Sequence, residues 1–240
     1  MFRPLAALLL LAFSPAALAQ DCASYALFDQ GTELTYTHYD RHDKEVGTTT
    51  TTVKEAGPAD DGYQAQLHSV QTDAKATSSH AVGYTATCSG GELKIDMRAF
   101  VPEEQMKAFG SYDIHFEGSE LQYPATLTVG KTLPDGKLTA DMTMQDAAPA
   151  MPAAMTHQTM QVDLVDRKVV AAEPITTPAG TFDSYKITYV SRIAVKGLVS
   201  IHSEAPIVAW YVPGLGGVKS ETLHKGNVRA STVLTALKRP

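Results

Sequence analysis

The chain has 240 residues, a formal net charge of −6 at neutral pH and a hydrophobic content of 44%. This hydrophobic content is ordinary for a globular protein and argues against global disorder. The mild excess of acidic residues argues against nucleic acids and anionic membrane surfaces as partners.

Residues 1–19 have the three parts of a secretory signal. Arg3 supplies a positive charge, residues 5–13 are apolar, and Ala17-Leu18-Ala19 forms a small-x-small cleavage site. The apolar run is shorter than the roughly 20 residues that span a bilayer, and no later segment reaches that length. We therefore expect cleavage to leave residues 20–240 as one exported domain without a transmembrane segment, in the bacterial periplasm or outside the cell.

The chain contains two cysteines, Cys22 and Cys88. In an oxidising compartment two thiols in a small exported domain most simply form one disulfide, and no C-x-x-C redox motif is present. Closing a loop of this length is worth about 4 kcal/mol in the chain-entropy model. Lipid attachment at Cys22 is not expected, because the charged Asp21 precedes it where a lipobox needs a small residue.

The first half of the chain is rich in β-forming residues. Strands are predicted over residues 32–39, 46–53, 63–70, 75–87 and 92–97, with a polar turn near residues 71–73. Five consecutive threonines, Thr48–Thr52, predict an exposed strand instead of a mucin-like tract, because the run has no proline.

Residues 102–109 (PEEQMKAF) predict a short helix. Pro102 suits the first helical position, Glu103 and Glu104 suit the positive end of the helix dipole, and Gly110 can end it. With only about two turns, this helix depends on packing for its stability.

Strands resume after this helix and continue to the C-terminus. They are predicted over residues 111–117, 137–144, 159–170, 182–195, 198–203, 207–212, 218–224 and 228–237. Glycine-supported turns are expected at residues 177–180 and 213–217, and residues 146–152 have little capacity for regular structure. About a dozen antiparallel strands without a βαβ rhythm predict an all-β fold with one short helix: a large, strongly curled antiparallel sheet or open β-barrel.

Three phrases in the second half resemble a known family. They are Tyr123-Pro124 with residues 129–136 (VGKTLPDG), residues 177–187 (TPAGTFDSYKI) and residues 210–221 (WYVPGLGGVKSE). In this order they resemble the DUF3108-like, or TapB-like, exported bacterial proteins. Ser184 departs from the cysteine that many of these proteins have at this place. The resemblance implies an exported, mostly antiparallel β protein, and some relatives look similar to curled-sheet carriers of the bacterial envelope; it implies no reaction.

Motifs of the common enzyme classes are missing from the sequence. It contains no G-x-S-x-G, no H-E-x-x-H and no P-loop, and the glycine-rich turns are not followed by a helix that would bind phosphate. We therefore expect a protein that is not an enzyme and needs no cofactor.

Copper binding is one alternative function. Methionines are concentrated between residues 142 and 160, and thioethers are soft ligands that suit Cu(I). The candidate ligands are Met151, Met155 and His157. The same methionines, with Met142, Met144 and Met160, could instead fill the core or an Ala/Pro-rich loop.

The favoured function is non-catalytic binding of an apolar or lipid-like envelope component, or of an envelope protein at a sheet edge. A curled sheet can leave a concave apolar face, although its interior can also be filled completely, which would indicate a structural or interaction protein. The residues predicted to line such a face are large and mostly aromatic: Tyr36, Phe116, Tyr185, Ile187, Tyr189 and Trp210.

Overall fold

The structure is a computed structural model that describes residues 22–75, 79–101, 112–145, 151–152, 156–197 and 200–240. The signal predicted for residues 1–19 and the helix predicted for residues 102–109 lie outside these residues. None of the helices in the described ranges has the length and apolar character needed to cross a membrane.

The described residues form thirteen strands that pair in one antiparallel sheet. In chain order the strands of the first half are β1 (Glu33–Asp40), β2 (Glu45–Ala59), β3 (Gly62–Asp73), β4 (Ser79–Ser89), β5 (Glu92–Ile95), β6 (Tyr112–Gly118) and β7 (Leu121–Tyr123). They are followed by β8 (Gly136–Met144), β9 (His157–Thr177), β10 (Gly180–Lys196), β11 (Ile201–Val212), β12 (Gly216–His224) and β13 (Asn227–Lys238). The described residues also form three short 3₁₀ helices: η1 (Cys22–Ser24), η2 (Ala26–Phe28) and η3 (Met97–Phe100).

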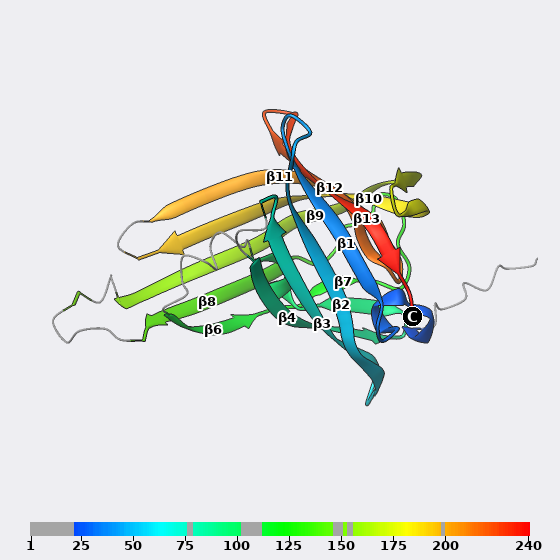
Figure 1. The fold of residues 1–240 in the computed structure, drawn as a ribbon, viewed down its shortest axis with the longest axis horizontal. Coiled ribbons are helices and arrows are strands. Elements are labelled where there is room, and N and C mark those ends of the chain that lie inside the picture. Colours follow the sequence, from blue (N-terminus) through cyan, green and yellow to red (C-terminus); the bar gives the residue numbers. More distant parts are fainter. Residues whose placement is uncertain (1–21, 76–78, 102–111, 146–150, 153–155, 198–199) are drawn as a thin grey trace, which may run out of the picture.

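The strand order is β6-β8-β9-β10-β11-β12-β13-β1-β2-β3-β4-β5-β7. In Figure 1, β1 to β4 cross the picture diagonally, whereas β8, β9 and β11 extend toward the left, so the sheet curls strongly. The edge strands β6 and β7 are joined only by Ser119 and Glu120, so the ends of these two strands lie within about 11 Å of each other. The predicted curled antiparallel sheet is confirmed, and the sheet stops short of closing into a barrel.

Several predicted elements differ from the structure at their boundaries. Residues 71–73, predicted as a turn, belong to β3, and Met97, predicted to end a strand, begins η3. The separate strands predicted over residues 198–203 and 207–212 are replaced by the single strand β11, which continues through Pro206 opposite Val190 of β10. Proline is normally a sign that a strand is interrupted, because it cannot donate a ladder hydrogen bond.

The threonine run lies in β2, as predicted, but it is not exposed. Thr51 is buried and the other four threonines are half-buried. The reason is that β2 is an interior strand, paired with β1 on one side and with β3 on the other. The alternate residues Thr49 and Thr51 face the inside of the curled sheet.

The core consists of two hydrophobic clusters. The larger one joins η1 and η2 to the inner faces of β1–β5 and β9–β13, and it contains the disulfide between Cys22 and Cys88 that the sequence predicted. The smaller one lies between η3, β7, β8, the first part of β9 and the end of β10. Met142 and Met160 are fully buried in this second cluster and serve as core residues.

Turn glycines occupy conformations that L side chains avoid. Gly180, Gly214 and Gly216 have φ values of 142°, 76° and 96°, which confirms the glycine-supported turns after β9 and β11. Gly214 also lies against the ring of Tyr25, where an added Cβ would be 2.7 Å from the nearest ring atom. This turn therefore packs on the N-terminal segment that the disulfide ties to β4.

Candidate functional site

A cavity of about 310 Å³ opens inside the curl of the sheet. Its wall comes mainly from β1, β2, β3 and β4, and η2, β5, η3, β12 and β13 also contribute to it. Most of this wall is apolar, with side chains that include Leu27, Leu34, Leu67, Val82, Ile95 and Phe100. The volume falls at the lower end of the range of small-molecule sites, about 300–1,000 Å³.

One strip of the cavity wall is polar and crosses four neighbouring strands. His38 of β1 has its Nδ1 2.9 Å from the hydroxyl of Thr232 and its Nε2 2.7 Å from the hydroxyl of Thr49. Two residues further along β2, the hydroxyl of Thr51 lies 2.6 Å from that of Ser69 on β3. His38 lies directly opposite Thr232, and Thr51 lies directly opposite Ser69, whereas His38 and Thr49 are diagonal neighbours on the same face.

Two tyrosines extend the polar strip. The Ser69 hydroxyl donates to the Tyr84 oxygen at 3.4 Å, and Tyr36 lies near Tyr84 in the same wall. Burial raises the pKa of Tyr84, although its hydrogen bonds with Ser69 and Thr51 oppose that shift. Burial, with a smaller effect of Tyr84, also raises the pKa of Tyr36 far above its usual value. Both phenols therefore stay neutral and keep their protons at physiological pH.

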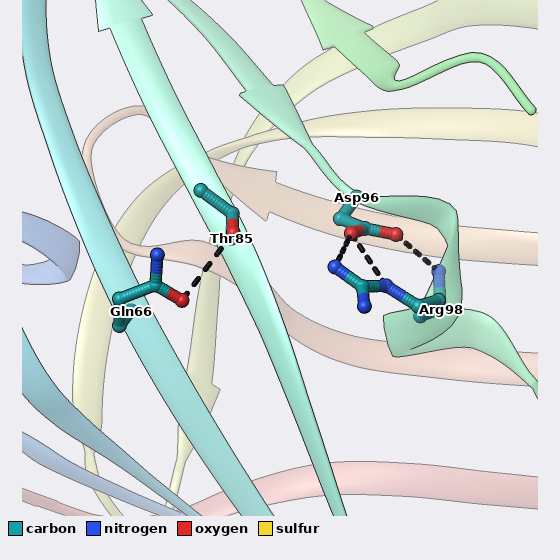
Figure 2. Close-up of polar contacts among 4 residues, drawn as sticks. All are labelled: Gln66, Thr85, Asp96 and Arg98. Carbon is teal, nitrogen blue, oxygen red and sulfur yellow. Dashed lines mark hydrogen bonds and ion pairs between the residues drawn. The ribbon is translucent and has the colours of Figure 1, made fainter. Parts of the chain in front are cut away.

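A single permanently charged side chain, that of Arg98, is found among the described residues of the cavity wall. Asp96 caps η3 by accepting the Arg98 backbone N–H at 2.9 Å, and its other oxygen accepts from Arg98 Nε at 2.6 Å. Arg98 Nη2 forms an ion pair with the same carboxylate. Figure 2 shows this closed pair beside the hydrogen bond from Thr85 to Gln66, so the positive charge of Arg98 is already compensated.

A family model described as DUF3108-like matches residues 29–234 of the chain, which includes every strand residue that lines the cavity. The chain belongs to the DUF3108-like family. Among curated proteins, the comparison finds no match.

Two solved structures resemble this DUF3108-like protein in fold. One, from Bacteroides fragilis and described as an exported protein with a YmcC-like fold, is 21% identical, with a TM-score of 0.68 over 88% of this chain and 96% of that one. The other, from Parabacteroides distasonis and described as a lipoprotein, is 22% identical, with a TM-score of 0.70 over 91% of this chain and 100% of that one. At these identities the likeness shows the shared fold.

The six residues predicted to line a ligand site do not surround one cavity in the DUF3108-like structure, although five of them lie in or against the larger core cluster. Tyr36 lines the cavity, whereas Phe116 lies in a separate surface hollow beside Arg98, and Tyr185 lies in another between β9 and β10. Ile187 is buried in the larger core cluster, and Tyr189 packs between the two clusters.

Trp210, the sixth predicted residue, lies on the face of β11 opposite to that of Tyr211. The ammonium groups of Lys186 and Lys219 lie 4.9 Å and 4.8 Å from its ring centroid, and its Nε1 donates to Glu173 at 2.9 Å. That hydrogen bond, with a further effect of Lys186, lowers the pKa of Glu173. Trp210 therefore belongs to a closed cation–π arrangement and does not reach the cavity.

Of the three residues proposed as copper ligands, the structure describes Met151 and His157. Met155 lies outside the described residues, Met151 is half-buried, and His157 is exposed at the start of β9. No group of three or more His, Cys, Asp or Glu side chains that could hold a metal ion occurs within the described ranges.

Sequence reasoning did not select His38, Ser69 and Tyr84, which form the polar strip with Tyr36. Each lies on a strand that was predicted correctly, at a position whose alternation marks it as inward-facing. The sequence predicted a curled sheet, but it did not indicate which strands the curl brings around one cavity.

Proposed function

We propose that this protein is a non-catalytic carrier that binds an apolar or lipid-like small molecule inside its curled sheet. The observation that carries the proposal is the cavity of about 310 Å³, which has an apolar wall and a single polar strip. Burial of apolar ligand surface there would supply the affinity, at about 25 cal/mol for each Å² removed from water. The few polar groups would fix the orientation of the ligand.

We further propose that the carrier works in the bacterial periplasm or outside the cell. The secretory features of residues 1–19 support this location. So does the disulfide between Cys22 and Cys88, because disulfides persist mainly in oxidising compartments.

The carrier function can be tested by titrating the protein with N-phenyl-1-naphthylamine, a neutral apolar dye whose fluorescence increases in an apolar site. We expect saturable binding with one site per chain. Val82→Trp, which places a large ring in the cavity, should weaken this binding at least about tenfold, because an occupied volume cannot accept the dye.

Ala81→Trp is the matched control, because Ala81 precedes Val82 on β4 and its side chain is exposed on the opposite face. It should bind the dye like the unaltered protein. Circular dichroism would verify that both variants are folded. Absence of saturable binding to the unaltered protein, or equal binding by Val82→Trp, would refute the carrier function.

A further inference from the structure

We propose that the cavity selects ligands with a neutral, hydroxyl-bearing polar end over ligands with an ionised one. This inference rests on the proposed carrier function and adds the chemical class of the ligand: an acyl chain that ends in a hydroxyl-rich or ester group, as in a monoacylglycerol. The observations that carry it are the charges, hydrogen bonds and burial of the polar strip.

The first observation is the absence of an available charge in the described cavity wall. Arg98 is the one permanently charged residue there, and its guanidinium is held by the Asp96 carboxylate through both Nε and Nη2. An ionised carboxylate or phosphate entering the cavity would lose its water without gaining a partner charge. A cationic end would meet no carboxylate among these residues either.

The second observation is the supply of neutral hydrogen-bonding groups. Within the part of the chain that the structure describes, the Tyr36 hydroxyl has no hydrogen-bond partner. The oxygen of Tyr84 accepts a hydrogen bond from Ser69, and Tyr84 is also hydrogen-bonded with Thr51, so this phenol already has partners within the wall. The Tyr36 hydroxyl thus offers one donor and one acceptor to a ligand, and burial keeps it protonated.

The third observation is that the rest of the polar strip is already satisfied. Both ring nitrogens of His38 are engaged by Thr49 and Thr232, and Thr51 is engaged by Ser69. These hydrogen bonds fix the side chains of the polar strip, which need no further hydrogen bond from a ligand. A neutral ligand end therefore meets the Tyr36 hydroxyl, beside Tyr84, as its available contact.

The test compares three ligands that share one twelve-carbon chain length: 1-monolauroylglycerol, laurate and dodecyltrimethylammonium. Each is used below its micellar concentration to displace N-phenyl-1-naphthylamine from the full mature chain at about pH 8, where the carboxylic acid is ionised. We expect 1-monolauroylglycerol to displace the dye with an affinity at least about tenfold higher than either ionic ligand. Equal or tighter binding of laurate or of dodecyltrimethylammonium would overturn the inference while leaving the carrier function intact.

A second measurement assigns the preference to the polar strip. Tyr36→Phe removes one hydroxyl and keeps the ring. It should weaken the binding of 1-monolauroylglycerol about three- to tenfold and leave the binding of the dye and of laurate unchanged. Tyr39→Phe is the matched control, because Tyr39 lies on the same strand and is not part of the cavity wall. An equal loss for all ligands in Tyr36→Phe, or no loss for 1-monolauroylglycerol, would contradict the role of the phenol. Failure of the dye to bind at all would instead refute the carrier function.

Discussion

Arg167 is the largest side chain that is fully buried in the described structure. Its Nη1 donates to the backbone carbonyls of Gln122 and Pro134, and its guanidinium lies 4.8 Å from the ring centroid of Tyr123. Tyr123 in turn stacks on Tyr211 with centroids 4.0 Å apart. Nη2 has no hydrogen-bond partner among the described residues, and no described carboxylate pairs with Arg167. The charge therefore costs free energy, while the stem and the ring contacts fill the interior.

This balance predicts different outcomes for two substitutions of Arg167. Arg167→Ala should lower the free energy of unfolding by about 3–5 kcal/mol, because it leaves a cavity and two carbonyls without a donor. Arg167→Met should remain within about 2 kcal/mol of the unaltered protein, because it fills the volume and removes an unpaired buried charge. Urea denaturation measures both values.

Arg192→Met is the control for the Arg167 substitutions. Arg192 is half exposed and pairs with Glu204 and Asp166 at the surface, so the substitution should change the stability by no more than about 1 kcal/mol. If Arg167→Met were as unstable as Arg167→Ala, the hydrogen bonds to Gln122 and Pro134 would outweigh the packing.

The orientation of Arg167 could not be predicted from the sequence. In the first part of β9 the buried residues are Met160, Val162 and Leu164, which implies that even positions face inward. Continuing this alternation would point Arg167 toward solvent, as expected for a charge. Tyr36 could be predicted as a lining residue because the alternation is regular along β1, where Leu34, Tyr36 and His38 all face the cavity.

At the scale of elements, the cause of the reversed alternation is a bulge in β9. The pairing of β9 with β10 shifts between Val165 and Lys168, and Asp166 takes a φ of 58°. From Val165 to Val169 the buried residues are Val165, Arg167 and Val169. The bulge therefore exchanges the inward-facing and outward-facing positions in the second half of β9, and the side chain of Arg167 points into the interior of the curled sheet.

The bulge predicts how substitutions of Asp166 behave. Asp166→Val should lower the free energy of unfolding by about 1–2 kcal/mol, because a β-branched side chain is disfavoured at positive φ. Asp166→Gly should be close to neutral, since glycine accepts this conformation and the Arg192 pair that it loses is exposed. Thermal or urea unfolding would measure the difference.

Lys168→Val is the matched control for the bulge, because Lys168 is an exposed residue of the same strand without positive φ. It should leave the stability unchanged or raise it slightly, as expected for a β-branched residue on a pleated surface. Equal stability of Asp166→Val and Lys168→Val would show that the bulge tolerates any side chain.

Strands with clear alternation and β-forming residues were predictable, and elements set by tertiary contacts were not. Residues 182–195 were assigned to a strand because polar and apolar residues alternate there, and β10 spans them. The edge strand β7 has three residues, which is too short to give a period. It forms only because Leu93, Lys94 and Ile95 offer a partner edge. The continuation of β11 through Pro206 likewise depends on its neighbours.

For the molecule as a whole, the buried tyrosines make the free energy of unfolding depend on pH in the alkaline range. Burial raises the pKa of Tyr25, Tyr36, Tyr84, Tyr123, Tyr189 and Tyr211. In the unfolded chain a phenol ionises near pH 10, so above that pH ionisation favours the unfolded state. The stability that the neutral, buried phenols give the folded state is fully present below about pH 10. It is lost as the pH rises through the higher pKa values of the folded state.

We therefore expect fewer than all ten tyrosines of the chain to ionise near pH 10 while the protein is folded. Near-ultraviolet absorbance of tyrosinate measures this count, and the urea midpoint should fall over the same pH range. The same chain unfolded in guanidinium chloride is the control, and there all tyrosines should titrate together. Ionisation of all ten near pH 10 with the fold intact would contradict the burial of these phenols.

The two ends of the described chain lie in the middle of the sheet and not at its margins. β1 pairs with β13, from Glu33 opposite Lys238 to Asp40 opposite Ala230, whereas most other neighbours in the sheet are consecutive along the chain. During folding β1 must therefore wait with one edge unpaired until β13 is in place, and this closure of a very long loop is the slowest kind of pairing to form. A chain that stopped before Asn227 would leave the edges of β1 and β12 open at the centre of the sheet, where an aggregating partner could add a strand.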